Sequence, residues 1–520
     1  MYTVYSLTTV IRHQIQAKKP VFACFIDAEK AFDRVDRDFV LFKLLKLGIR
    51  GKLYNSVKNI YNECYNCVDV NGNITNWFSA DVGVKQGDGL SPTLFGIYVN
   101  DIITEISEMD VGIEIGDRKM SILAYADDIV VLGKSEEELQ NILDVVGNWG
   151  KKWRMKFNCA KSNVIHFRKH SVPRTNFAFN LGGYEIDIVD NYKYLGVPMN
   201  ENLDYSFTAN KFASAGSRAL GSIVNKYKKL NGLGYYTYTK LYNSCVCPVL
   251  DYCSEVWGYK DFSKINSVQN RALRVYLGVH QRTSNLMING DMGWTSCQTR
   301  RYIAMVRFYN RLLAMDDNRI AKRVFLWEKD LRTHGWAHEI KSLFEKIGQL
   351  HLFDSNRRCN INRVWAELFD LSSLKWKHDV QNSAKLRTYV NFKHEFGTDP
   401  YVYKILNRGF RSVVSKFRSG TLPLEIEVGR WRGTPLEERI CKLCDLGNIE
   451  DEAHFLLECT LYSTNRQNFF NRVNQRNPSF EQKNSQEKIS ILMSLEFIVE
   501  MSKFLFKCLT IRNETMYNSI

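Results

Sequence analysis

The chain has 520 residues, of which 45% are hydrophobic and 24% charged, so it is long enough for several folded domains and is not a disordered tail. Its 71 Lys and Arg residues against 56 Asp and Glu give a net charge of +15, which suits a polyanionic partner such as nucleic acid. No apolar run is long enough to span a bilayer and the first residues do not resemble a signal peptide, so we expect a nuclear or cytoplasmic protein that is not secreted and does not bind a membrane.

The first elements lead to an isolated acidic residue. Residues 4–19 predict a helix, and the apolar run at 21–26 is typical of a buried strand. That strand ends at Asp27, where a carboxylate can project into a cleft. Asp33 and Asp36 are expected to begin the following helix, because Asp is favoured at helix starts, and we assign them no chemistry.

A β-hairpin with two carboxylates at its tip is predicted at residues 122–132. Two short apolar runs flank Tyr125-Ala126-Asp127-Asp128. Adjacent carboxylates repel one another, and a bound divalent cation reverses that penalty. A solvated turn explains the pair equally well, since Asp is common in turns. If Asp27 lay beside this tip, the three carboxylates would suit Mg²⁺, which prefers oxygen ligands.

The second half of the chain has a helical pattern. Apolar residues recur at three- and four-residue spacing through 205–285, and helical signals continue to about residue 430. Basic clusters with an aromatic residue among them occur at 151–156, 226–229 and 430–432. Basic side chains neutralise phosphates while aromatic rings stack on unpaired bases. Each cluster alone is better explained as a solvated helix face, but their number and the net charge favour a nucleic-acid surface.

A possible metal site lies near the C-terminus. Its four residues have the spacing C-x2-C-x9-H-x4-C, and they are Cys441, Cys444, His454 and Cys459. Zn²⁺ prefers four such ligands in a tetrahedron, and closed sites of this kind are structural. Coincidence among thirteen cysteines and ten histidines is the alternative. We predict one structural zinc ion.

Five segments in fixed order carry a resemblance to a known family. They are residues 25–33, 83–92, 125–128, 157–162 and 194–196. Together they resemble the palm of a reverse transcriptase, specifically that of non-LTR (LINE-type) retrotransposons, and residues 241–258 resemble the thumb region of these elements. The resemblance implies an RNA-directed DNA polymerase that transfers a nucleotide from a dNTP to a primer 3′-hydroxyl, with two catalytic Mg²⁺ ions. The implied partners are an RNA template, a DNA primer and dNTPs.

The resemblance also implies roles for the acidic and basic residues of these segments. Asp27 and Asp127 would be the two metal ligands, with Asp128 as a weaker or partial ligand. Lys161 would protonate or neutralise the pyrophosphate leaving group, although a solvated surface charge would look the same in sequence.

Further roles concern the nucleotide and the primer. Phe32 would exclude a 2′-hydroxyl from the sugar site, unless it is simply a core aromatic. Gln86 and Gly87 would contact the incoming nucleotide and the template, unless Gly87 belongs to an ordinary loop. The primer would be gripped by a turn made of Tyr194, Leu195 and Gly196.

The expected fold is α+β: a palm with an antiparallel sheet and packed helices, a helical thumb, a helical extension and a small zinc-binding module. We place these at residues 1–200, 205–285, 286–430 and 431–465, with a helical tail at 466–520. In the family a fingers region precedes the first Asp segment, and here we expect it to be missing, together with any endonuclease domain. A catalytically impaired nucleic-acid-binding remnant is therefore the alternative function.

Overall fold

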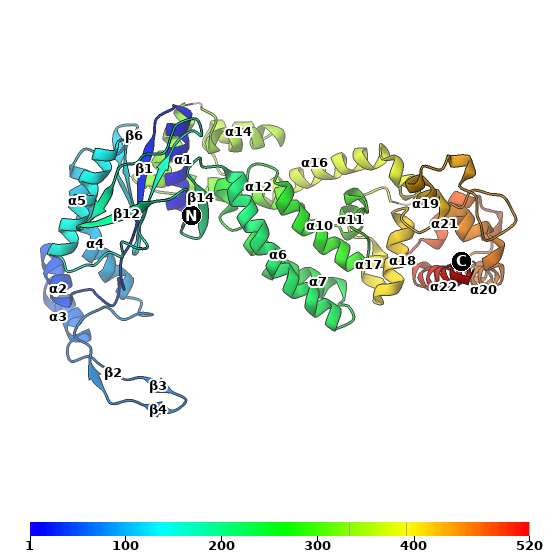
Figure 1. Ribbon diagram of the computed structural model, residues 1–520, viewed down its shortest axis with the longest axis horizontal. Coiled ribbons are helices and arrows are strands. Elements are labelled where there is room, and N and C mark those ends of the chain that lie inside the picture. Colours follow the sequence, from blue (N-terminus) through cyan, green and yellow to red (C-terminus); the bar gives the residue numbers. More distant parts are fainter. Residues whose placement is uncertain (332, 392, 519–520) are drawn as a thin grey trace. The chain divides into compact units, whose positions relative to one another are not determined.

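The computed structural model describes residues 1–331, 333–391 and 393–518, which form two compact units (Figure 1). Unit 1 consists of Met1–Thr208, Glu255–Tyr259 and Met305–Arg358. Unit 2 consists of Ala209–Ser254, Lys260–Ala304 and Cys359–Ile520. Each unit is described by itself.

A six-stranded sheet forms the centre of unit 1, with the strand order β11-β12-β10-β1-β9-β8. The strands are β1 (Val21–Asp27), β8 (Ile122–Tyr125), β9 (Asp128–Gly133), β10 (Asn163–Phe167), β11 (Phe179–Leu181) and β12 (Tyr184–Ile188). The mixed α+β architecture is as predicted, but the sheet is not wholly antiparallel, because β10 and β12 pair in parallel. The segment between them is long enough to cross over and return in the same direction, which a short hairpin cannot do.

Helices cover this sheet because β1 is apolar on both faces. Every β1 residue from Val21 to Ile26 is buried, as expected for a central strand covered on both sides. Alternate residues of β1 belong to the core cluster that includes side chains of α4 (Ser91–Glu108) and α5 (Glu136–Lys152). The predicted N-terminal helix is α1 (Tyr2–Gln16), which contacts β1 and β8.

Two helices and a long arm follow β1. Residues 29–34 form turns rather than the start of a helix, and α2 (Arg37–Lys46) begins after Asp36, whose side chain accepts from the backbone N–H of Asp38 and Phe39. Asp36 is therefore the predicted helix start, whereas Asp33 is not. After α3 (Gly51–Ile60), the short strands β2 (Tyr65–Asn66), β3 (Asp69–Val70), β4 (Asn73–Ile74) and β5 (Phe78–Ser79) form an arm that projects from the helices (Figure 1).

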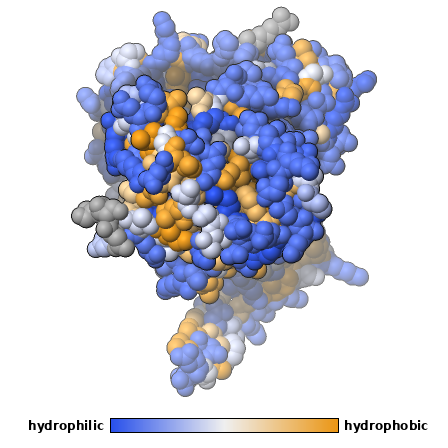
Figure 2. Space-filling model, turned by 90° about the vertical axis from the view of Figure 1, so that its right-hand side faces the viewer, coloured by the Kyte–Doolittle hydropathy of each residue, from blue (hydrophilic) through white to orange (hydrophobic). Residues whose placement is uncertain are grey.

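Unit 2 is largely helical. Its helices include most of α6 (Tyr205–Lys229), followed by α7 (Tyr235–Cys245), α10 (Ser263–Leu277), α11 (Asn285–Met292), α16 (Ile361–Gln381), α18 (Arg408–Arg418), α19 (Glu425–Arg432), α20 (Ser463–Arg476) and α22 (Ile498–Asn518). In its core the buried guanidinium of Arg418 donates to Asp291 at 2.8 Å and to Asp399 at 2.6 Å. Figure 2 shows small groups of apolar side chains among hydrophilic ones on the face it presents.

Candidate active site and metal centre

Three aspartates come together at one end of the unit 1 sheet. The predicted hairpin is confirmed: β8 and β9 are joined by a two-residue turn in which Ala126 has a φ of 53° and Asp127 follows. β9 begins at Asp128 and β1 ends at Asp27, and strand pairing places these two residues opposite each other. Cα atoms of antiparallel partners lie about 5 Å apart. Two carboxylates from strands about a hundred residues apart in sequence are thus neighbours, with the third next to them at the tip.

The charges of these carboxylates oppose one another. Loss of solvent raises the pKa of Asp128, and the nearby charges of Asp127 and then Asp27 raise it further. A bound cation removes that repulsion and favours the ionised form. The donor set, three carboxylates with partial exposure, therefore fits a hard divalent ion such as Mg²⁺.

The segment that carries Lys161 is fixed to β1 by two hydrogen bonds of the Asp27 backbone. Asn158 N donates to Asp27 O at 2.8 Å, and Asp27 N donates to Ser162 Oγ at 3.1 Å. Lys161 lies between these two contacts, and its side chain is exposed. The loop therefore keeps Lys161 close to the end of β1, with its side chain in solvent.

Residues that follow Asp27 in the chain contact the 83–92 segment. The ring of Phe32 is half-buried and stacks on Phe95 with 4.9 Å between centroids and 11° between planes. Val84 N donates to Phe32 O at 2.9 Å, which brings the 83–92 segment against residues 32–35. Gln86 Nε2 donates to Asp33 Oδ1 at 3.1 Å. We assigned no chemistry to Asp33 from the sequence, because only the fold brings it to Gln86.

Gly87 occupies a position that favours glycine. Its φ is +86°, a left-handed conformation that L side chains rarely adopt, and there is open space around it. Open space beside a backbone of this kind lets a ligand approach the main chain closely. The structure thus leaves the backbone accessible at the position assigned to nucleotide and template contact.

The turn at residues 194–196 joins β13 (Asn191–Tyr194) to β14 (Val197–Asn200). Leu195 has a φ of 46° and Gly196 a φ of 82°, as a tight two-residue hairpin requires. Tyr194 is buried, and its ring lies 5.2 Å from the ring of Phe25 in β1. Burial raises the pKa of Tyr194, with a further contribution from Asp128, so this hairpin lies near the aspartates.

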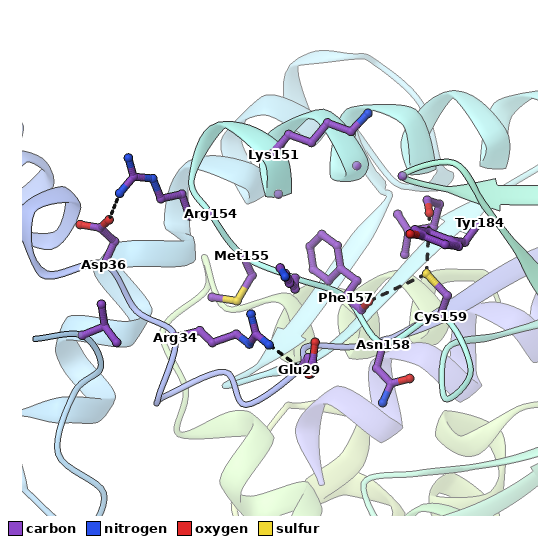
Figure 3. A pocket seen from close by; sticks show the side chains of 16 residues that line it. Glu29, Arg34, Asp36, Lys151, Arg154, Met155, Phe157, Asn158, Cys159 and Tyr184 are labelled. Atoms are coloured by element: carbon purple, nitrogen blue, oxygen red, sulfur yellow. Dashed lines mark hydrogen bonds and ion pairs between the residues drawn. The ribbon is translucent and has the colours of Figure 1, made fainter. Parts of the chain in front are cut away.

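A groove of about 980 Å³ lies next to the Lys161 loop (Figure 3). Its lining includes Lys151, Arg154 and Lys156 of the basic cluster predicted at 151–156, together with Phe157 and Tyr184. Two of its cations already have acidic partners: Arg34 pairs with Glu29 at 3.1 Å and Arg154 with Asp36 at 3.0 Å.

The basic cluster at 430–432 is less available for nucleic-acid contact than its sequence suggests, because its side chains contact carboxylates of the same unit. Arg430 pairs with Glu427 at 2.7 Å, and Trp431 donates to the same carboxylate at 3.1 Å. Arg432 lies 3.9 Å from Glu425. By contrast, the three lysines at 226, 228 and 229 are exposed at the end of α6.

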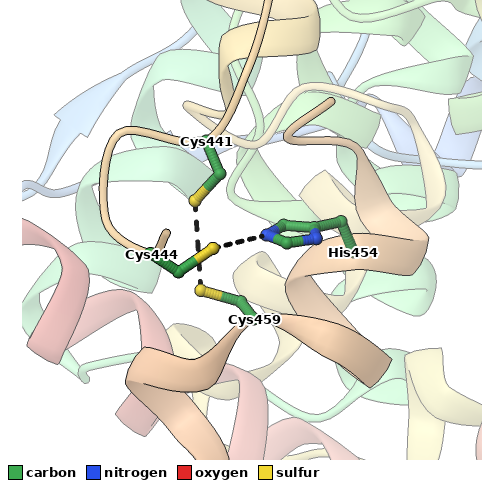
Figure 4. A group of neighbouring side chains, drawn as sticks. All are labelled: Cys441, Cys444, His454 and Cys459. Atoms are coloured by element: carbon green, nitrogen blue, oxygen red, sulfur yellow. Dashed lines mark hydrogen bonds between the residues drawn. The ribbon is translucent and has the colours of Figure 1, made fainter. Parts of the chain in front are cut away.

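In unit 2 the four residues of the predicted zinc motif converge (Figure 4). Their ligand atoms all lie within 4.8 Å of one another, with 3.9 Å between the sulfurs of Cys441 and Cys459 and 3.4 Å from Cys444 Sγ to His454 Nε2. Thiolates around a tetrahedral Zn²⁺ at 2.3 Å would be about 3.8 Å apart. Within the described part of the chain, no other group of three or more His, Cys, Asp or Glu side chains is held this closely for a metal. The aspartates of unit 1 are a more open set.

Contacts around these four residues support metal binding. His454 Nδ1 lies 3.2 Å from Glu458 Oε2, which leaves Nε2 to face the sulfurs. His454 and Glu458 are in a π-helix (His454–Glu458) rather than an ordinary helix. Burial raises the pKa of Cys441 to about 12, and a bound cation would reverse that cost.

In the described part of the chain, no helix combines the length with the apolarity that crossing a membrane requires.

Residues 3–199 match the reverse transcriptase (RNA-dependent DNA polymerase) family. The chain is 28% identical over 283 residues to the RNA-directed DNA polymerase from mobile element jockey of Drosophila melanogaster, a match that covers 51% of this chain and 29% of that protein. It is 24% identical over 341 residues to the probable RNA-directed DNA polymerase from transposon BS of the same species, covering 60% and 36%. The chain thus spans 29% and 36% of the length of these two relatives.

Among solved structures, telomerase from Candida albicans is 12% identical with a TM-score of 0.30, and the match covers 68% of this chain and 51% of that chain. The sequence matches identify the family and agree with the order of the five segments. Residues 3–199 are a reverse transcriptase domain of the kind found in the RNA-directed DNA polymerases of non-LTR retrotransposons.

Proposed function

We propose that the chain itself extends a DNA primer on an RNA template. The observation that carries this proposal is the register that sets Asp27 against Asp128, with Asp127 at the adjoining tip. A reverse transcriptase domain that had lost its chemistry would be under no pressure to retain three mutually repelling carboxylates in one place.

Asp27 and Asp127 are proposed as the principal Mg²⁺ ligands, with Asp128 as a partial ligand. Two bound Mg²⁺ ions would lower the barrier to attack of a primer 3′-hydroxyl on the α-phosphate of a dNTP and neutralise the leaving pyrophosphate. An open set of carboxylates is appropriate here, because substrate phosphates and water complete the coordination shell of Mg²⁺ in such sites and no closed set of protein ligands is needed.

The neighbouring residues would orient the substrates. Phe32, braced by Phe95, would pack under the sugar and leave no room for a 2′-hydroxyl. Gln86, held by Asp33, and the open backbone at Gly87 would contact the base pair being formed.

The leaving group and the primer would be contacted by the Lys161 loop and by the β13–β14 hairpin. Lys161 is on a loop that is hydrogen-bonded to Asp27, so its ammonium would lie within reach of the pyrophosphate. The β13–β14 hairpin, anchored through Tyr194 on Phe25, would hold the primer end with Leu195 and Gly196.

We further propose that Cys441, Cys444, His454 and Cys459 hold one structural Zn²⁺. The palm, thumb, extension, zinc module and tail would be residues 1–200, 205–285, 286–430, 431–465 and 466–520. The spacing of the four ligand atoms supports the zinc site, and the all-helical character of residues 205–285 supports a thumb.

The test uses the purified chain with a primed RNA template, Mg²⁺ and labelled dNTPs. Template-dependent incorporation that stops when one dNTP is omitted would support the proposal. Salt-sensitive binding of the primed template without incorporation would instead establish the impaired remnant.

A further inference from the structure

A cavity of about 290 Å³ in unit 2 is lined mainly by neutral polar side chains. It lies where α10, α11 and α16 meet residues 294–299, and the three helices lie side by side in unit 2 (Figure 1). Its volume is at the lower end of the range for ligand sites, which suits one small group rather than a helix or a duplex. The Asn and Gln side chains that line it are Asn266, Gln269, Asn270, Asn285, Asn289 and Gln298.

Two of these amides leave a donor and an acceptor unused. Asn289 Nδ2 donates to Asn285 O at 2.7 Å and to Asn270 Oδ1 at 3.1 Å. Since a backbone carbonyl can only accept, the contact with Asn285 O fixes which atom of the Asn289 amide is the nitrogen. Asn289 Oδ1 and Asn270 Nδ2 make no hydrogen bond within the described part of the chain. Neighbouring residues of the cavity wall thus offer one acceptor and one donor.

Aromatic rings complete the wall of the cavity. Phe369 and Phe396 line it and are partly exposed, with 6.0 Å between their centroids and 68° between their planes. Phe396 is supported from behind by the buried Trp376, whose ring centroid is 5.6 Å away. Partly exposed aromatic rings of this kind stack on unpaired bases. The cavity therefore combines a stacking surface with hydrogen-bonding groups for the edge of a planar ring.

The charged groups of the cavity favour a neutral occupant. Asp261 accepts from Asn266 Nδ2 at 2.7 Å, and Asp379 lies 3.4 Å from His378 Nδ1, so both carboxylates already have contacts. Lys375 is exposed and forms no ion pair among the described residues. An uncharged ring can enter such a site, while a phosphate attached to it would stay outside and meet Lys375.

The residue types also select among the bases. Asn and Gln amides bind adenine through two hydrogen bonds, because its amino group donates beside a ring nitrogen that accepts. Guanine is usually bound by Arg or Lys, and no arginine lines this cavity. Cytosine is usually bound by a free carboxylate, and both carboxylates here have other contacts. Adenine is therefore the base that fits this set of groups.

We propose that this cavity binds one unpaired adenine of a nucleic-acid strand. The adenine amino group donates to Asn289 Oδ1, a ring nitrogen accepts from Asn270 Nδ2, and the ring stacks on Phe369 or Phe396. The inference rests on the proposed function only in that the chain must hold a nucleic-acid strand. The site itself lies in unit 2 and takes no part in nucleotide transfer.

Labelled nine-nucleotide strands test this with the full chain, by fluorescence anisotropy at physiological salt without Mg²⁺ or dNTPs. We expect an RNA with one central adenine among uridines to bind about tenfold more tightly than the all-uridine RNA. Replacing that adenine with purine riboside, which lacks the amino group, should remove most of the difference. Equal affinities for the first two strands, or equal binding when guanine replaces adenine, would overturn the proposal.

The corresponding DNA strands, with one adenine among thymidines or none, identify the source of the base. A tenfold preference in DNA as well as RNA assigns recognition to the base alone. A preference in only one of the two adds a contact with its sugar. Absence of the preference in both contradicts the proposal.

A matched pair of variants locates the preference in the cavity. Asn270→Asp keeps the oxygen that accepts from Asn289 and replaces the unused donor with an acceptor. The ratio of the two RNA affinities should fall to about one. Asn362→Asp makes the same charge change at an exposed position of α16 outside the cavity, and it should retain the tenfold ratio. An unchanged ratio in Asn270→Asp would contradict the assignment.

The two RNA strands carry the same charge, so a general loss of affinity does not alter their ratio. Thermal unfolding checks that Asn270→Asp is folded, and the purine riboside strand tests the hydrogen bond on the wild-type chain if it is not. Primer extension with no preference for adenine would remove this inference alone and leave the proposed function standing.

Discussion

At the scale of single residues, the site depends on where strands end. Asp27 is the last residue of β1 and Asp128 the first of β9, so both side chains are at the edge of a buried sheet rather than within it. Both faces of β1 are buried, so one residue of slippage in this pairing would exchange the two faces and set each side chain against neighbours of a different size and shape. Packing of the core therefore determines the register of β1 and β9, and this register places Asp27 opposite Asp128.

Asp127→Asn should abolish primer extension with little change in folding. Asp127 is exposed at a hairpin tip, so its replacement removes a charge but no packing. We expect the extension rate to fall about a hundredfold or more. Single-turnover extension and thermal unfolding measure the two effects.

Asp187→Asn is the matched control, since Asp187 is an exposed residue of β12 in the same sheet. It should leave extension unchanged. If Asp127→Asn extended primers as well as this control does, Asp127 would not be a metal ligand.

Phe32→Ala should weaken discrimination against ribonucleotides. Without the ring, the sugar site gains room for a 2′-hydroxyl, so the preference for dNTP over rNTP should fall about tenfold or more. The ratio of kcat/KM for dGTP and GTP measures this. Phe32→Tyr should retain the preference. Unchanged selectivity in Phe32→Ala would mean that Phe32 only packs on Phe95.

At the scale of elements, contacts between distant helices decide local chemistry. Glu328 in α13 (Ile320–Leu331) is buried beneath α1 and α14 (Trp336–Lys346). Its carboxylate accepts from Trp336 N at 2.8 Å, Ala337 N at 3.0 Å and Tyr5 Oη at 3.5 Å. Burial raises the pKa of Glu328 to about 7, despite these donors.

This pKa makes the stability of unit 1 depend on pH. The unfolded chain releases the Glu328 proton near its ordinary pKa of 4.5 and the folded chain near 7, so stability falls as pH rises between these values. The expected loss is about 3 kcal/mol. Chemical unfolding at several pH values should show a steeper decline in wild type than in Glu328→Gln. Parallel curves would contradict the assignment.

Zinc removal should destabilise unit 2. Arg466 of α20 donates to Leu456 O at 3.0 Å and Cys459 O at 2.7 Å, and Arg512 of α22 pairs with Glu450 at 2.8 Å, so the helical tail packs on the metal-binding segment. A chelator should therefore release about one Zn²⁺ per chain and lower the unfolding temperature.

Cys444→Ser should abolish stoichiometric zinc in metal analysis, whereas Cys245→Ser, at an exposed cysteine elsewhere in unit 2, should retain it. Full zinc content in Cys444→Ser would rule out the four-residue site.

At the scale of the whole molecule, charge is distributed unevenly. The chain is strongly basic, yet several cationic clusters are internally paired, as at residues 430–432, and the arm is acidic. The exposed lysines near the end of α6 are therefore stronger candidates for nucleic-acid contact than the Arg-Trp-Arg cluster.

Affinity for a primed RNA template should fall about a hundredfold or more between about 50 and 200 mM salt, because binding releases counterions from phosphates. Neutralising Lys226, Lys228 and Lys229 to Gln should reduce the slope of log K against log salt by about 2. The control Lys503→Gln/Lys507→Gln, on α22, should not change it. Equal slopes for both variants would exclude the end of α6 from the interface.

Features that depend on near neighbours in the chain could be predicted from local patterns of residues. The hairpin at 122–132, the buried strand before Asp27, the helix start at Asp36 and the four zinc-type ligands follow from local patterns of apolar, acidic and cysteine residues. The order of five segments also identified the family, since order needs no knowledge of contacts.

Contacts between residues far apart in the chain could be read only from the fold. The pairing of Asp27 with Asp128, the bond from Gln86 to Asp33, the parallel β10–β12 pair and the exposure of the arm each join or separate residues far apart in sequence. Such contacts depend on how whole strands pack against one core, and many pairings satisfy the same local pattern. Burial and long-range register determine which of these pairings forms, and a local pattern does not encode either of them.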